Sequence, residues 1–287
     1  MRFGRRGSVA VVPARGVFMD HEAGASGGIL QMIVHAGAAP TTAAAARLIE
    51  ADGLVAARQT AAERRERARR EVAALALRRA SAAALWAQAL PLAGSLAERY
   101  LRQTRAIAAP LNGADLRFLP EAPVFPYDPH CRERRPAMVA RLSDAGGRGI
   151  GAHLTYLRAD GLGKAEMGSP RKVAGTRQGG FVHLAPGARV IVGEGLESSL
   201  AAWQARPPEP TDVGAVAAIC AGGMAGLIWP VGTEALIIAP DCDKTGEGAA
   251  EALARRAWGA GLVVSFMRPP EGFKDWNDAA RARRARP

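Results

Sequence analysis

Two short motifs in the last third of the chain place acidic residues directly after apolar runs. Glu194 follows the apolar run 190–193. Asp241 and Asp243 follow a second such run, 235–239, and a glycine comes soon after the acids in both motifs. Apolar runs of this length, ended by acids and glycine before a helix-forming segment, are typical of buried parallel strands. Because parallel strands end at one edge of the sheet, we expect the three carboxylates to meet where α/β sheets bind ligands.

Three carboxylates without a histidine or cysteine cluster suit a hard metal ion. Oxygen ligands favour Mg²⁺ or Mn²⁺, which bridge phosphate oxygens to carboxylates. The five histidines form no ligand spacing, and the three cysteines are far apart, so we expect no zinc and no disulfide framework. Unpaired cysteines also fit a reducing cytoplasm. The cysteines are Cys131, Cys220 and Cys242.

Taken alone, Asp241 and Asp243 also fit a turn and a helix cap, because aspartate accepts hydrogen bonds from free helix N–H groups. The order of the surrounding parts favours the metal site. A third acidic element, Lys-Asp-Trp-Asn-Asp at residues 274–278, follows another strand-like run at 261–267. With the three elements in this order, the last hundred residues resemble a Toprim domain.

The resemblance implies roles for particular residues. In Toprim proteins the glutamate and the Asp-x-Asp pair carry the metal ions and the acid–base chemistry of phosphodiester making or breaking. We expect Glu197, one helical turn after Glu194, to be a solvated residue that favours the helix dipole. By position, the catalytic residues are Glu194, Asp241 and Asp243, and the metal ligands are the same three with Asp275 and Asp278 as further candidates.

The charge of the chain is unevenly distributed. Residues 1–187 carry 27 Lys and Arg against 15 Asp and Glu, whereas residues 188–287 carry 11 against 12. A positive field over the first two-thirds would hold a phosphate backbone, and a merely solvated basic surface stays the alternative. Hydrophobic residues make up 48% of the 287 residues, which allows one or two domains with a core.

The first ninety residues fall into two parts. Residues 1–36 contain strand-like runs at 7–12 and 16–21 and a double glycine that opens a helix. They resemble the latter half of the zinc-binding domain of bacterial and phage primases, and we expect a truncated segment without metal ligands. Residues 37–94 form a helical connector: Thr41 and Thr42 can cap a first helix, and a second, rich in arginine, can extend from after Gly53 to Pro91. Its arginines are either a solvated face or a surface that tracks DNA.

Residues 95–187 resemble the α+β segment that precedes the Toprim domain in phage- and plasmid-type primases and primase-helicases. The helix near its start usually continues into arginine-glycine-leucine, where this chain has Arg105, Ala106 and Ile107. In that family a lysine near the end of the segment lies by the incoming nucleotides, and Lys172 takes this position. We therefore expect a catalytic Toprim domain at 188–287, with a Rossmann-like and mainly parallel sheet.

Lysine use agrees with these assignments. The chain has 34 arginines and four lysines, and each lysine falls within one of the motifs. A compact ammonium suits a position beside a triphosphate or a metal-linked carboxylate better than a planar guanidinium. The expected nucleotide- and phosphate-binding residues are Lys164, Arg171, Lys172, Lys244 and Lys274, of which Lys244 would orient the carboxylates.

Together the resemblances imply a DNA primase-like nucleotidyltransferase of DNA replication. It would make short RNA primers from ribonucleoside triphosphates on a single-stranded DNA template by two-metal phosphoryl transfer. The chain has no P-loop, so a replicative helicase would be a separate partner, and glycines and a proline in the uncharged stretch 213–233 argue against a membrane span. A non-catalytic single-stranded DNA-binding Toprim remnant of a mobile element and a Toprim nuclease stay open. A topoisomerase would need a gate domain for which no segment is left.

Overall fold

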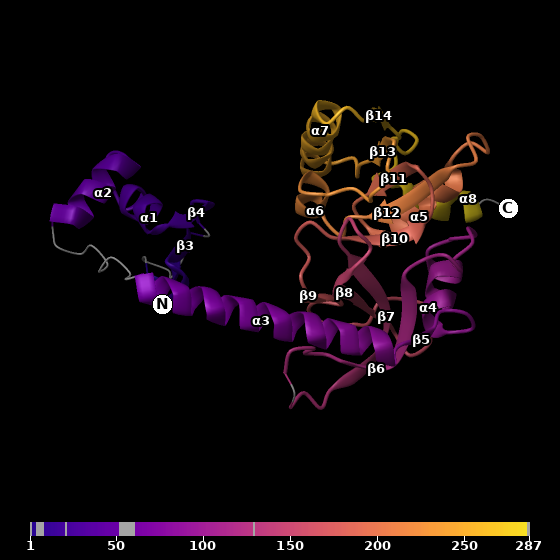
Figure 1. Ribbon diagram of the computed structural model, residues 1–287, viewed down its shortest axis with the longest axis horizontal. Coiled ribbons are helices and arrows are strands. Elements are labelled where there is room, and N and C mark those ends of the chain that lie inside the picture. The colour runs from indigo at the N-terminus through magenta and orange to yellow at the C-terminus, as the bar shows by residue number, and fades with distance from the viewer. Residues whose placement is uncertain (1, 4–8, 21, 52–60, 129, 286–287) are drawn as a thin grey trace. The chain divides into compact units, whose positions relative to one another are not determined.

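The protein is described by a computed structural model (Figure 1), which divides into two compact units, Met1–Arg70 and Glu71–Pro287. We call them the amino-terminal and carboxyl-terminal units. The structure describes residues 2–3, 9–20, 22–51, 61–128 and 130–285.

In its described part, the amino-terminal unit contains a four-stranded antiparallel sheet followed by helices. Gly28 precedes the first helix, and its N–H donates to Gln31 Oε1 at 3.0 Å. Thr41 Oγ1 accepts from Ala44 N at 3.1 Å and caps the second helix. The predicted strands, glycine-opened helix and threonine cap are therefore present, while residues 4–8 lie outside the described part. The elements are β1 (Arg2–Phe3), β2 (Val9–Val12), η1 (Pro13–Arg15), β3 (Val17–Asp20), β4 (Ala25–Gly28), α1 (Ile29–His35) and α2 (Thr42–Ala51).

The long arginine-rich helix α3 (Ala61–Gln88) is present as predicted, and its expected start falls outside the described residues. Side chains from residue 64 to residue 80 are exposed. Near its end, Ala82 and Leu85 are buried against the sheet of the carboxyl-terminal unit together with Leu154 and Tyr156. The last two turns of α3 therefore belong to the core of that unit.

The carboxyl-terminal unit contains, in its described part, a ten-stranded mixed sheet whose main path runs β14-β13-β11-β12-β10-β7-β6-β5. The four strands from β14 to β12 are parallel, and the remaining pairs are antiparallel, with β8 and β9 branching from β7. The strands are β5 (Leu90–Pro91), β6 (Leu116–Pro123), β7 (Arg134–Ser143), β8 (Gly149–Tyr156), β9 (Arg171–Gly175), β10 (Phe181–Ala185), β11 (Arg189–Gly193), β12 (Val213–Ala217), β13 (Ala235–Ala239) and β14 (Val263–Phe266).

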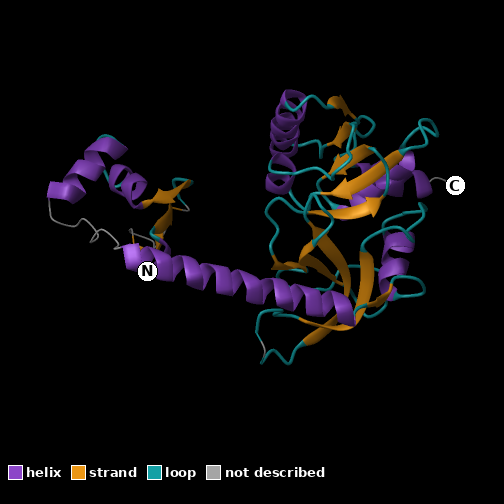
Figure 2. Ribbon diagram, in the orientation of Figure 1, coloured by secondary structure: helices purple, strands orange, loops and turns teal. Residues whose placement is uncertain are grey.

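Helices cover both faces of the parallel strands, which gives the predicted α/β architecture (Figure 2). Along β11, Val190 and Val192 pack toward one pair of helices, and Ile191 packs toward the other pair. This alternation explains why β11 is apolar from Val190 to Gly193, after the exposed Arg189 at its start. The first pair is α6 (Ala221–Ala225) and α7 (Lys244–Gly259), and the second is α5 (Leu196–Ala205) and α8 (Trp276–Arg284).

The uncharged stretch 213–233 forms strand β12, a turn and helix α6, as expected. None of the helices in the described residues is both long and apolar enough to cross a membrane.

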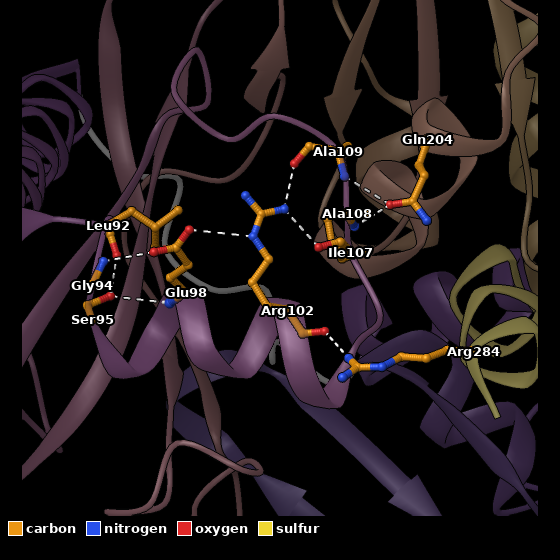
Figure 3. A network of polar contacts seen from close by, with 10 residues as sticks. All are labelled: Leu92, Gly94, Ser95, Glu98, Arg102, Ile107, Ala108, Ala109, Gln204 and Arg284. Atoms are coloured by element: carbon orange, nitrogen blue, oxygen red, sulfur yellow. Dashed lines mark hydrogen bonds and ion pairs between the residues drawn. The ribbon is translucent and has the colours of Figure 1, made fainter.

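The segment between residues 95 and 111 is held by side chains from the helices of the parallel part (Figure 3). It consists of α4 (Leu96–Arg99), the π-helical turn η2 (Tyr100–Thr104) and an extended stretch. Arg102 donates to the carbonyls of Ile107 and Ala109 at 2.8 and 2.7 Å, and Gln204 Oε1 accepts from Ala109 N at 3.0 Å. Arg284 donates to the carbonyl of Arg102. The bonds from Gln204 and Arg284 hold this segment, which precedes strand β6, against α5 and α8.

Candidate active site

Glu194 and Asp241 emerge at the same edge of the sheet. Strands β11 and β13 are adjacent and parallel, and their last residues, Gly193 and Ala239, are partners in register. The acidic residues follow within two positions of those ends. A side chain at Gly246, in the first turn of α7, would contact both Glu194 and Asp241, so only a glycine lets α7 begin this close to the two strand ends.

Each of these carboxylates has one buried oxygen that no donor of the described residues reaches. The two oxygens are Glu194 Oε1 and Asp241 Oδ1, and neither has a hydrogen-bond partner in the part of the chain that the structure describes. Burial, reinforced by the charges of Asp241 and Asp243, raises the pKa of Glu194 to about 7. Burial, with the charges of Asp275 and Asp243, raises the pKa of Asp241 to about 6. Buried acceptors that repel one another require a positive ligand or protons.

Of the remaining acids, two cap helices and the third lies near an arginine. Asp243 caps α7, where its carboxylate accepts from Thr245 N and Gly246 N, so the helix-cap interpretation holds for this residue. Asp275 caps α8 in the same way and lies near enough to raise the pKa of Asp241. Asp278 is 3.8 Å from Arg281 Nη1.

The carboxylate oxygens are chemically suited to bind a hard divalent cation, but they do not by themselves form a complete coordination shell. Two orphaned carboxylate oxygens beside further carboxylates are the ligands that Mg²⁺ and Mn²⁺ prefer, and Mg²⁺ commonly takes one or two carboxylates and completes its shell with water and phosphate oxygens. Within the described residues, no three His, Cys, Asp or Glu side chains are grouped closely enough to hold a metal by themselves.

Two of the predicted cations lie close enough to act on the acids. Lys274 lowers the pKa of both Glu194 and Asp241, although burial and the neighbouring acids outweigh it. Arg171, which is exposed at the start of β9, acts on Asp241 in the same direction. Both can therefore meet a ligand that approaches the carboxylates.

Lys172 and Lys244 are placed differently. Lys172 follows Arg171 in β9 and so points to the opposite face of the sheet. Its Nζ donates to Val124 O at 2.6 Å and lies 4.0 Å from the centre of the Phe125 ring. The structure does not bring Lys172 to the acids, and Lys244 is an exposed residue at the start of α7. Their phosphate-binding roles stay predictions.

Glu197 is not solvated, so the expectation for this residue was wrong. Its residue exposure is 7%, and Lys164 Nζ lies 3.3 Å from its Oε1. The physical reason is that α5 is buried on every side from Leu196 to Trp203, including its first turn. The sequence carries a signal for this: small and apolar residues surround the whole helix, a pattern typical of a buried helix.

Sequence reasoning also missed the partners of Glu197. Tyr100, Arg105 and Lys164 converge on it, although only Lys164 had been singled out as a candidate. His153 lies nearby on β8, where burial lowers its pKa to about 4. Its Nδ1 has no hydrogen-bond partner among the described residues. Because these residues come from separate segments, their convergence depends on the tertiary fold.

The comparison with known families identifies the segment that contains the three acidic motifs. Residues 189–285 match the family model of the Toprim domain. The chain contains a Toprim domain. The prediction made from the order of the acidic motifs is thereby confirmed. Residues 76–184, which precede the Toprim domain, match a domain of unknown function (DUF7146).

Two solved primase structures align with this chain. The zinc-binding and RNA polymerase domains of Aquifex aeolicus primase align with a TM-score of 0.45 and 15% identity, over 96% of this chain and 74% of that one. The primase fragment of the bacteriophage T7 primase-helicase aligns with a TM-score of 0.35 and 16% identity, over 52% of this chain and 58% of that one. The search of curated proteins gave no match.

Proposed function

We propose that this Toprim protein is a primase-like nucleotidyltransferase that joins ribonucleotides on a single-stranded DNA template. The observation that carries the proposal is the pair of buried, donor-free oxygens, Glu194 Oε1 and Asp241 Oδ1, at the strand ends of the Toprim domain. Carboxylates in this condition are suited to binding divalent cations during phosphoryl transfer. Among Toprim reactions we favour polymerisation, because the sequence of residues 95–187 resembles the segment that precedes the Toprim domain in phage- and plasmid-type primases.

In this proposal the residues have distinct tasks. Glu194 and Asp241 would hold Mg²⁺ or Mn²⁺, with Asp243 and Asp275 adding negative charge nearby and Asp278 as a further candidate. When bound, the cation supplies charge neutralisation on the triphosphate and activation of the attacking hydroxyl. Arg171 and Lys274 would bind phosphate oxygens, and Lys164 would join them from the neighbouring segment. The uneven positive charge of residues 1–187 would hold the template backbone.

A Toprim domain that binds single-stranded DNA without catalysis is the second candidate. It is favoured by the absence, among the described residues, of three grouped metal-ligating side chains. It is also favoured by the helix cap at Asp243. The Asp243 carboxylate accepts two hydrogen bonds from α7, although the primase proposal uses this carboxylate near the metal. A Toprim nuclease would use the same carboxylates for cleavage.

The test is ribonucleotide incorporation on primed and unprimed single-stranded templates, with Mg²⁺ or Mn²⁺ and with or without Zn²⁺. Because residues 1–36 contain no cysteine, the proposal predicts efficient extension of an annealed primer, weak initiation and no response to added zinc. Template cleavage would indicate the nuclease. Template binding without metal-dependent incorporation would indicate the binding protein.

A further inference from the structure

A buried polar cluster lies beside the first turn of α5, with Glu197 at its centre. The Glu197 side chain is 9% exposed, and its Oε1 accepts a hydrogen bond from Tyr100 OH at 2.6 Å. Lys164 Nζ is 3.3 Å from the same oxygen, and Arg105 Nε is 4.0 Å from it. Two cations and one hydroxyl from the segment before the Toprim domain therefore meet on a single Toprim carboxylate.

The cluster continues to the third acidic motif. Arg105 Nε donates to Tyr100 OH at 2.8 Å, and its Nη1 donates to Asn277 Oδ1 at 3.4 Å. Asn277 Nδ2 returns a bond to the carbonyl of Arg105 at 2.7 Å. Asn277 is two residues from Asp275, so the cluster links the first and third acidic motifs of the Toprim domain to residues 100–105.

Glu197 is ionised within this cluster. Burial alone would raise its pKa, but Lys164, Arg171, the Tyr100 hydrogen bond and Arg105 together lower it to about 2. A buried ion pair is a weak source of stability, since apolar side chains of the same volume often stabilise a fold equally well. The arrangement is better explained by the fixed geometry that it imposes on its cations.

Lys164 is the cation whose position matters most for the proposed reaction. Its side chain is 17% exposed, so it is held mainly inside the protein. The charge of Arg171, which is exposed at the start of β9, acts on both Lys164 and Asp241. Glu197 lies one helical turn after Glu194, so Lys164, 3.3 Å from Glu197, is held next to the first acidic motif.

We propose that Glu197 is a positioning residue, whose carboxylate holds Lys164 beside the acidic site so that Lys164 and Arg171 receive the phosphates of a nucleoside triphosphate. This inference rests on the proposed function for its ligand class. It goes beyond that function because Glu197 itself touches neither the metal nor the nucleotide. Neutralising Glu197 releases Lys164 and weakens nucleotide binding. Glu194 and Asp241, which serve the chemical step, are left unchanged.

The experiment measures ATP binding to the full chain with Mg²⁺ by equilibrium dialysis, for Glu197→Gln, Lys164→Met and the double variant. Each single change is expected to weaken ATP binding about tenfold, the scale of one charge-assisted hydrogen bond. The double variant should bind no more weakly than Lys164→Met, because Glu197 acts through Lys164. Tyr100→Phe keeps the carboxylate charge and should change ATP binding less than about threefold.

The matched control is Glu251→Gln, which neutralises an exposed glutamate of α7 that lies 3.8 Å from Arg255. It should leave ATP binding unchanged. Melting temperatures confirm that each variant is folded. Should Glu197→Gln fail to fold, the comparison of Lys164→Met with the double variant, which removes both charges, still tests the proposal.

Several results would overturn the positioning role: unchanged ATP binding in Glu197→Gln, losses that add in the double variant, or no ATP binding by the wild-type chain. ATP binding with the predicted pattern but no ribonucleotide incorporation would support the positioning role and overturn the priming function alone. In active protein, Glu197→Gln should raise the KM for nucleotide about tenfold and change kcat less than about threefold. A loss confined to kcat would contradict the proposal.

Discussion

Glu194 and Gly246 lie so close together that a Cβ atom at position 246 would be 2.7 Å from Glu194 Oε1. The same atom would be 2.5 Å from the carbonyl oxygen of Asp241. Two acidic motifs separated by almost fifty residues are therefore packed against one glycine. Glu194 and Asp241 can lie this close together because residue 246 has no side chain.

Gly246→Ala should accordingly damage both the fold and the site. Because the carbonyl of Asp241 is backbone and cannot rotate away, we expect a loss of about 1–3 kcal/mol in unfolding free energy, together with loss of metal-dependent activity. Urea unfolding and the incorporation assay check this. Gly248→Ala, two residues further along α7 with nothing within 4 Å of its Cβ, should instead stabilise by about 0.5–1 kcal/mol.

The metal-free protein should lose stability as the pH rises toward neutral. The pKa of Glu194 is raised from 4.5 to about 7, and that of Asp241 from 3.8 to about 6. Both groups bind protons more tightly in the folded state. Their contribution to stability is therefore full below pH 3.8 and is lost as the pH passes through about 6 to 7.

Thermal unfolding in chelator from pH 5 to pH 8 measures this loss. Glu194→Gln should raise the unfolding free energy at pH 8 by about 1 kcal/mol and flatten the pH dependence. Added Mg²⁺ should stabilise the wild type at pH 8 and should stabilise Glu194→Gln much less. A variant with the same pH profile and metal response as the wild type would contradict the shared carboxylate site.

Ala106 has a left-handed backbone with a φ of 55°. Alanine is strained in this conformation, whereas glycine adopts it freely. Ala106→Gly should therefore stabilise the chain by about 0.5–1 kcal/mol in chemical unfolding. Ala108→Gly, in the same segment without a positive φ, should destabilise it, and equal effects of the two changes would refute the strain argument.

Single-stranded DNA binding should depend on α3 and on salt. Arg69 lies in its exposed stretch, and if it contacts a phosphate, Arg69→Gln should weaken binding and lower the slope of log K against log salt by about 0.7. Arg255→Gln, in α7 of the nearly neutral Toprim domain, is the matched control. If the slope of log K against log salt is the same in both variants and the wild type, the α3 arginines are solvated and do not contact DNA.

The sequence was sufficient for the elements that follow periodic patterns. The apolar runs before Glu194 and Asp241 predicted two buried parallel strands correctly, since strand burial is encoded locally. Strand alternation could also have shown that Arg171 and Lys172, adjacent in β9, cannot face the same site.

Other features depend on the assembled fold. The burial of Glu197 requires Tyr100 and Lys164 to come from segments 97 and 33 residues away. Likewise, the donor-free state of Glu194 Oε1 reflects which groups fail to reach it, and no local pattern encodes such an absence. Sequence reasoning therefore found the acids and missed the cluster that surrounds them.

Whether the three acids form one catalytic site is decided by ribonucleotide incorporation on single-stranded DNA with Mg²⁺ or Mn²⁺. The proteins compared are the wild type, Glu194→Gln, Asp241→Asn and Asp243→Asn. Asparagine also caps helices, so the third variant removes charge while largely keeping the α7 cap. We predict that the wild type incorporates nucleotides and that each variant stays folded and loses at least about a hundredfold in rate. Wild-type incorporation that persists in all three variants would contradict this prediction.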